Sequence, residues 1–77
     1  MPSQLLHLVA EVLQMPVTEI GPDTGPATTG QWVSLRHLQI IAKVEQTYDV
    51  SFTPREIRGI RSVSDLREYL SRQGVAE

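Results

Sequence analysis

Residues 34–48 read SLRHLQIIAKVEQTY, with apolar side chains recurring at the spacing of an α-helix. The pattern predicts a helix over this range, and its apolar content indicates the most buried element of the chain. We expect its core face to consist of Leu35, Leu38, Ile41, Ala42, Val44 and Tyr48.

The segment before this helix has the composition of a loop. Residues 15–33 hold three prolines, three glycines and four threonines, with few large apolar residues. These residue types favour turns, and a loop of this length usually has a function. We expect three side chains to anchor it in the core: Val17, Ile20 and Trp32.

Three shorter helices are predicted around the central one. The first follows a candidate cap at Ser3 and ends at Pro16. The second of them covers 53–59, where Thr-Pro-Arg-Glu forms a capping box with proline at the first helical position. The last starts after Ser62 and stops at Gly74. Their apolar positions are Leu5, Leu6, Val9, Val12, Leu13, Val63, Leu66, Tyr69 and Leu70.

Length and composition indicate one small all-α domain. The chain of 77 residues is 40% hydrophobic and 21% charged, which suits a globular fold and not a disordered one. We therefore expect a single domain over 1–77, with its core at about 3–73, as a four-helix bundle with a long loop between the first two helices. No apolar run reaches the roughly 20 residues that span a bilayer. A cytoplasmic monomer is expected, without disulfides because there is no cysteine.

The charge pattern bears on possible partners. A net charge of −2 argues against a general nucleic-acid binder. One alternative is a small helix-turn-helix protein that uses 53–61 as a basic recognition segment, although the overall acidity counts against it.

The junction between the loop and the central helix carries the most distinctive motif. Residues 30–35 read Gly-Gln-Trp-Val-Ser-Leu. This segment resembles the attachment motif of acyl carrier proteins, in which a serine before a leucine begins the second helix. In that family an aspartate usually precedes the serine, and many members have a tryptophan two residues before it. Here Val33 stands in the place of the aspartate, while Trp32, Ser34 and Leu35 match.

The resemblance covers nearly the whole chain. From Ser34 to Leu70 the sequence follows the family pattern without a gap, although the preceding loop is one residue longer and lacks a usual phenylalanine. The further matches are Ile20 to Thr24, Leu38, Ile41, Val44, the Tyr48-Asp49-Val50 ending, Phe52, Ile57, Ile60 and Val63.

The resemblance implies a carrier and not an enzyme. A phosphopantetheinyl transferase would attach 4′-phosphopantetheine from coenzyme A to Ser34. The arm would carry acyl groups as thioesters between acyl-loading, acyl-transferring or condensing enzymes. Fatty-acid carriers have a strongly acidic second helix, whereas here that helix contains Arg36 and Lys43. This difference favours polyketide, nonribosomal-peptide or other specialised acyl metabolism.

Two groups of residues are expected around the attachment site. The predicted partner-docking surface comprises Val33, Leu35, Arg36, Lys43, Arg58 and Arg61. If the acyl chain folds back, we expect it to pack where Ala42, Phe52, Ile57 and Ile60 face one another.

Elementary chemistry also suits Ser34 to this role. A primary hydroxyl at a helix N-terminus lies near unpaired backbone N–H groups and the positive end of the helix dipole, which favours a phosphodiester there. The simpler alternative is that Ser34 only caps the helix. A further alternative is an unmodified interaction module, which Val33 makes possible. His37 is interpreted as a surface residue, and no catalytic triad or metal-ligand spacing is present in the sequence.

Overall fold

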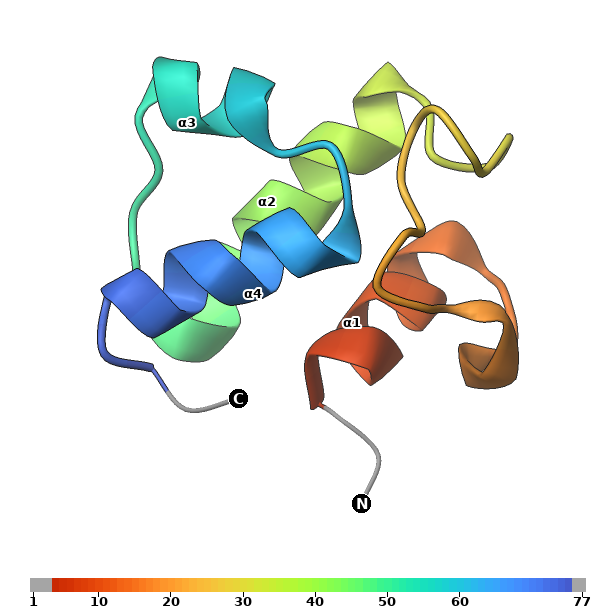
Figure 1. Cartoon of the computed structure of the whole chain (residues 1–77), viewed down its shortest axis with the longest axis horizontal. Coiled ribbons are helices and arrows are strands. Elements are labelled where there is room, and N and C mark those ends of the chain that lie inside the picture. Colours follow the sequence, from red (N-terminus) through yellow and green to blue (C-terminus); the bar gives the residue numbers. More distant parts are fainter. Residues whose placement is uncertain (1–3, 76–77) are drawn as a thin grey trace.

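The computed structural model describes residues 4–75 and contains helices but no strand within that range (Figure 1). The prediction of a small all-α bundle is confirmed. The expected cap Ser3 lies outside the described residues. In chain order the elements are α1 (Gln4–Leu13), the short 3₁₀ helix η1 (Val17–Glu19), α2 (Ser34–Tyr48), α3 (Pro54–Gly59) and α4 (Val63–Arg72).

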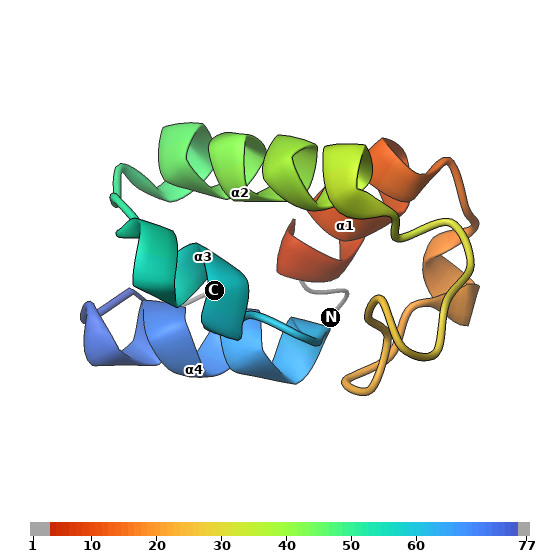
Figure 2. The same cartoon turned by 90° about the horizontal axis from the view of Figure 1, so that it is seen from above.

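The core lies between α1, α2 and α4. Figure 2 shows α2 and α4 on opposite sides, with α3 between them near one end and the long loop at the other end. The loop adds Ile20 and Trp32 to the core, and Val17 packs partly buried against it, so the three predicted anchors are confirmed. The fully buried side chains come from the three longer helices: Leu5, Val9, Leu13, Ile40, Val44, Val63, Leu66 and Leu70.

The buried face of α2 differs from the prediction. Leu35 and Leu38 are 66% and 56% exposed, and Ala42 is exposed as well. These residues lie three and four positions apart and therefore share one side of the helix, which faces solvent. The buried side instead holds Ile40, Ile41 and Val44. The expectation that Leu35, Leu38 and Ala42 belong to the core face was wrong, and Ile40 was missing from it.

Local capping sets the starts of α3 and α4, as predicted. The Thr53 side chain accepts a hydrogen bond from the Glu56 N–H, and the Glu56 carboxylate accepts one from the Thr53 N–H at 2.8 Å. At α4 the Ser62 hydroxyl accepts from the Asp65 N–H at 3.2 Å. Both arrangements satisfy N–H groups that the first helical turn leaves unpaired.

The predicted core position of Tyr69 is also confirmed. Its ring stacks on Phe52 with the centroids 4.0 Å apart, and its hydroxyl donates a hydrogen bond to the Ser51 carbonyl. Burial, followed by the charges of Glu56 and Glu45, raises the pKa of the Tyr69 phenol. These contacts fasten the segment between α2 and α3 to α4.

The long loop is seated on the N-terminus of α4. The Thr24 carbonyl accepts a hydrogen bond from the Val63 N–H at 2.9 Å, and the Pro22 carbonyl accepts one from the Ser64 N–H at 3.0 Å. Gly25 is buried at this contact. The loop thereby supplies partners for two amide groups at the start of α4 and holds residues 26–33 beside α2 and α3.

Candidate functional site

Ser34 is the first residue of α2 and its side chain is exposed. The N-cap is Val33, which has extended backbone angles and no side chain able to cap. The Ser34 hydroxyl makes no hydrogen bond to any residue within 4–75. The alternative that Ser34 serves only as the N-cap is therefore wrong, because Val33 holds that position and the exposed Ser34 hydroxyl caps no N–H group of the described residues.

The backbone around Ser34 presents hydrogen-bond donors. The first hydrogen bond of the helix runs from the His37 N–H to the Val33 carbonyl at 2.9 Å. The N–H groups of Ser34, Leu35 and Arg36 precede this bond and have no backbone acceptor among residues 4–75. Together with the helix dipole, they favour an anionic group close to the hydroxyl.

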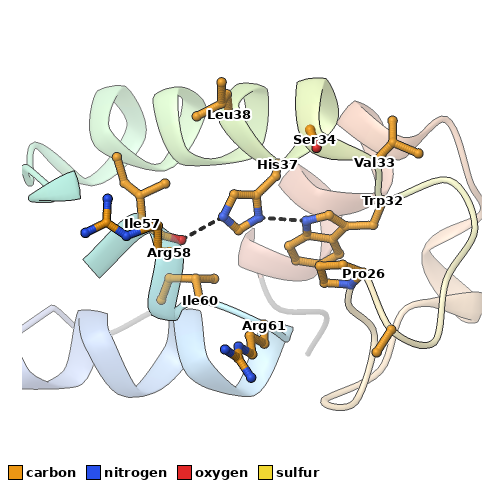
Figure 3. Close-up of a pocket in the computed structure, with 11 residues that line it drawn as sticks. Pro26, Trp32, Val33, Ser34, His37, Leu38, Ile57, Arg58, Ile60 and Arg61 are labelled. Carbon is orange, nitrogen blue, oxygen red and sulfur yellow. Dashed lines mark hydrogen bonds between the residues drawn. The ribbon is translucent and has the colours of Figure 1, made fainter. Parts of the chain in front are cut away.

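An open pocket of about 670 Å³ adjoins Ser34 (Figure 3). It lies between the start of α2, the short helix α3 and the loop that precedes α2. Most of its wall is apolar, and it is large enough for a small acyl chain. The lining residues are Pro26, Ala27, Trp32, Val33, Ser34, His37, Leu38, Ile57, Arg58, Ile60 and Arg61.

His37 connects the loop with α3 across this pocket. The Trp32 Nε1–H donates a hydrogen bond to His37 Nδ1 at 2.9 Å, and His37 Nε2 lies 2.8 Å from the Ile57 carbonyl oxygen (Figure 3). Indole nitrogen can only donate and a carbonyl can only accept, so both bonds require a neutral imidazole with its proton on Nε2. His37 is half-buried and bridging. Its interpretation as a plain surface residue is corrected.

The structure brings together only two of the four residues predicted to form an acyl pocket. Ile57 and Ile60 line the pocket, whereas Ala42 is exposed on α2 and Phe52 is buried against Tyr69. The prediction that these four side chains face one another is therefore corrected. Ala42 lies on the side of α2 that faces solvent. The additional wall comes from residues that the sequence pattern did not assign to a pocket: Pro26, Ala27, Trp32, His37 and Leu38.

Three exposed apolar side chains gather beside Ser34. Val33, Leu35 and Leu38 are 55%, 66% and 56% exposed, and they are the large hydrophobic residues that the described chain leaves most open to solvent. We call them the apolar strip. Two of them, Val33 and Leu35, belong to the predicted docking surface. Exposed apolar residues that form a patch are typical of contact sites, and these three lie within six consecutive positions of the chain.

The predicted positive surface around Ser34 is divided. The Arg36 guanidinium donates to the Val12 carbonyl of α1, and Lys43 Nζ lies 2.6 Å from the Glu11 carboxylate. Both cations therefore turn toward α1, whereas Arg58 and Arg61 line the pocket. The expectation that all four surround the attachment site together was wrong. Sequence spacing did not reveal that Arg36 and Lys43 turn toward α1, because their partners Val12 and Glu11 lie more than 20 positions from them in the chain.

A His37→Leu substitution is expected to lower the free energy of unfolding by about 1–3 kcal/mol. Trp32 is only 2% exposed, so its indole N–H would lose its acceptor without gaining water. Chemical denaturation followed by Trp32 fluorescence measures the effect. His7→Leu is the control because His7 is exposed on α1. Equal stability of the His37 variant and the parent would show that the bridge contributes nothing.

Within residues 4–75, no helix is both long and apolar enough to cross a membrane, and no cluster of side chains is arranged to hold a metal ion. No protein-family model matches the chain, and no curated protein matches its sequence.

Proposed function

We propose that this chain is a non-catalytic acyl carrier that tethers acyl groups as thioesters on a 4′-phosphopantetheine arm at Ser34. The observation that carries the proposal is the Ser34 hydroxyl itself. It is exposed at the first position of α2, takes no part in capping, and lies at the edge of a largely apolar pocket. The resemblance of residues 30–35 to the carrier attachment motif supports the same function.

The attachment chemistry uses Ser34 as the acceptor. Its oxygen would attack the phosphorus of coenzyme A that bears the pantetheine group. A new P–O bond forms, the pyrophosphate P–O bond breaks, 3′,5′-adenosine diphosphate leaves, and the hydroxyl proton passes to a base of the transferase. The resulting phosphodiester would lie near the unpaired N–H groups at the start of α2, which favour it electrostatically.

The arm supplies a thiol that the chain lacks. There is no cysteine in the sequence, so a thioester requires the sulfur of pantetheine. A thioester is reactive enough for acyl transfer, and tethering raises the effective concentration of the cargo at each docked enzyme. Apolar cargo could fold back against Leu38, Ile57 and Ile60, where burial of each CH₂ group stabilises it by about 0.8 kcal/mol.

The apolar strip is the proposed docking surface for the transferase and for acyl-loading, acyl-transferring or condensing enzymes. Two of its members, Val33 and Leu35, are the direct chain neighbours of Ser34, so a partner that covers the strip would bring its active site to the arm. The acidic second helix of fatty-acid carriers is absent, and one cation of α2, Lys43, is already paired with Glu11. We therefore assign the carrier to polyketide, nonribosomal-peptide or other specialised acyl metabolism.

A second candidate function is an unmodified interaction module. It is favoured by Val33, which is 55% exposed at the position where carriers usually have aspartate. Such a module would use the apolar strip for binding and leave Ser34 unmodified. The two functions differ in one property, the covalent arm.

Intact-mass measurement distinguishes them. The protein is incubated with coenzyme A and a phosphopantetheinyl transferase of broad specificity, beside an established carrier as a positive control. A mass increase of one phosphopantetheine supports the carrier. Unmodified protein with several transferases that do modify the control would contradict it.

The Val33→Asp substitution is expected to increase the rate of modification by a general transferase. The acidic side chain expected by carrier-recognising enzymes would be placed next to Ser34, at a position where the Val33 side chain is 55% exposed. Aspartate is also a good N-cap, so the helix should not weaken. Initial rates measured by mass spectrometry test this. Equal rates for both proteins with several transferases would show that position 33 does not limit recognition.

A further inference from the structure

We infer that the pocket selects a carboxylate-bearing acyl chain, with its far end bound at the wall to which Arg58 and Arg61 contribute. This inference rests on the proposed function, since it concerns the cargo of the Ser34 arm. It names the chemical class of that cargo, an ω-carboxyacyl group, in place of a simple alkyl chain.

The charge of the pocket is one-sided. Arg58 and Arg61 are its only charged lining residues, and no acidic side chain lines it in the described part of the chain. Neither guanidinium has a hydrogen-bond or ion-pair partner within 4–75. By contrast, Lys43 is paired with Glu11 and Arg72 with Glu68.

The acidic residues nearest in sequence are already engaged. The Glu56 carboxylate accepts from the Thr53 N–H at the start of α3. The Asp65 carboxylate accepts from the Arg61 backbone N–H at 2.9 Å. Neither carboxylate makes an ion pair with Arg58 or Arg61 within residues 4–75. Two guanidiniums without an ion-pair partner favour an anionic ligand, and their planar donors suit a carboxylate.

The positions of these groups match an amphiphilic chain. Figure 3 shows Ser34 on α2 and Arg61 on the opposite side of the pocket, beyond Ile60. Apolar side chains of Leu38, Ile57 and Ile60 lie along the walls. A chain with a methylene middle and an anionic end would fill the apolar wall and reach the guanidiniums. A purely alkyl chain would cover the same wall and gain no contact with the two guanidiniums, which are exposed and stay hydrated.

The test compares two six-carbon cargoes on the full chain. The transferase loads the protein from hexanoyl- or adipoyl-coenzyme A, and intact mass verifies one group per protein. Trp32 is the single tryptophan, so its indole N–H gives one resonance that reports on the pocket. We expect the adipoyl group to populate the pocket about threefold to tenfold more than hexanoyl, and the difference to shrink in high salt because exposed ion pairs are screened.

Substitutions identify the side chains responsible. Arg58→Gln and Arg61→Gln are each expected to reduce the preference for adipoyl and to leave the hexanoyl signal unchanged. Arg55→Gln is the matched control, because Arg55 lies on the same short helix α3 but does not line the pocket. Loss of the preference in the Arg55 variant to the same extent would overturn the assignment.

The phosphodiester of the arm is the other possible anion. If it binds the guanidiniums, their side-chain resonances shift on addition of the arm alone and do not shift further with adipoyl, which would overturn the inference. A second experiment tests the pocket without the transferase, so that a failure to attach the arm is distinguished from a failure of the pocket to bind the cargo. The Ser34→Cys variant has one thiol, since the chain has no other, and it can be alkylated with matched neutral or carboxylate-ended chains. A carboxylate preference there supports the pocket even if no arm is added enzymatically. Equal Trp32 shifts for both chains, in loaded and alkylated protein, would refute it.

Discussion

Ser34→Ala is expected to abolish phosphopantetheinylation completely while leaving the fold intact. The Ser34 hydroxyl has no hydrogen bond within residues 4–75, and its side chain is exposed. Its removal therefore costs no packing, and alanine has the highest helix propensity. We expect the free energy of unfolding to change by no more than about 0.5 kcal/mol. If the variant is not labelled, the cause is then the missing hydroxyl acceptor and not unfolding of the protein.

The other serines near α4 provide the control for this experiment. The Ser62 hydroxyl accepts from the Asp65 N–H and is committed to capping. Ser64 is exposed on the first turn of α4, away from the pocket lining. Ser64→Ala should be labelled like the parent. Labelling that persists in Ser34→Ala, or that peptide mapping assigns to Ser62 or Ser64, would contradict the assignment of the attachment site.

Features encoded by neighbouring residues were predictable from the sequence. The Thr53 capping box and the Ser62 cap each use partners three positions away, and both occur as predicted. The extent of α2 was also predicted correctly. So was the stop of the last helix at Gly74, which has a φ of +78° just after α4. Such local interactions depend only on residue type and spacing.

The buried face of α2 was not predictable in the same way. Apolar residues occupy both sides of this helix, so periodicity alone does not show which side meets the core. Ile40 is completely buried while Leu35 is 66% exposed, although both are branched aliphatic residues of similar size. The choice follows from the positions of α1 and α4, which cover only one side. The exposed side is the one that the proposed function uses.

Contacts between distant residues account for the remaining differences at the site. His37 meets Ile57 across 20 positions, and Arg36 meets Val12 across 24. No local rule links these pairs, and the backbone carbonyl acceptors leave no signal in the sequence. Part of the pocket wall beyond Ile57 and Ile60 could not be deduced because Pro26, Ala27 and Trp32 reach it only through the seated loop.

Gly25→Ala is expected to lower the free energy of unfolding by about 3 kcal/mol or more, a large part of the roughly 5–15 kcal/mol typical of natural domains. A Cβ atom at Gly25 would lie 1.9 Å from the Arg61 carbonyl oxygen and 2.8 Å from the Arg61 carbonyl carbon. These are backbone atoms, so no change of rotamer relieves the overlap. The loop would have to leave α4, with loss of the hydrogen bonds that Thr24 and Pro22 accept from it.

This displacement should also disturb the site. Pro26 and Ala27 follow Gly25 directly and line the pocket. We expect the Trp32 signal to change and the pocket preference for one cargo over another to decrease, even below the unfolding temperature. Urea denaturation followed by circular dichroism and Trp32 fluorescence measures stability. Gly30→Ala is the matched control, because no atom lies within 4 Å of its added Cβ, and it should stay within about 0.5 kcal/mol of the parent. Equal stability of the two alanine variants would show that the close approach of Gly25 to Arg61 does not hold the loop in place.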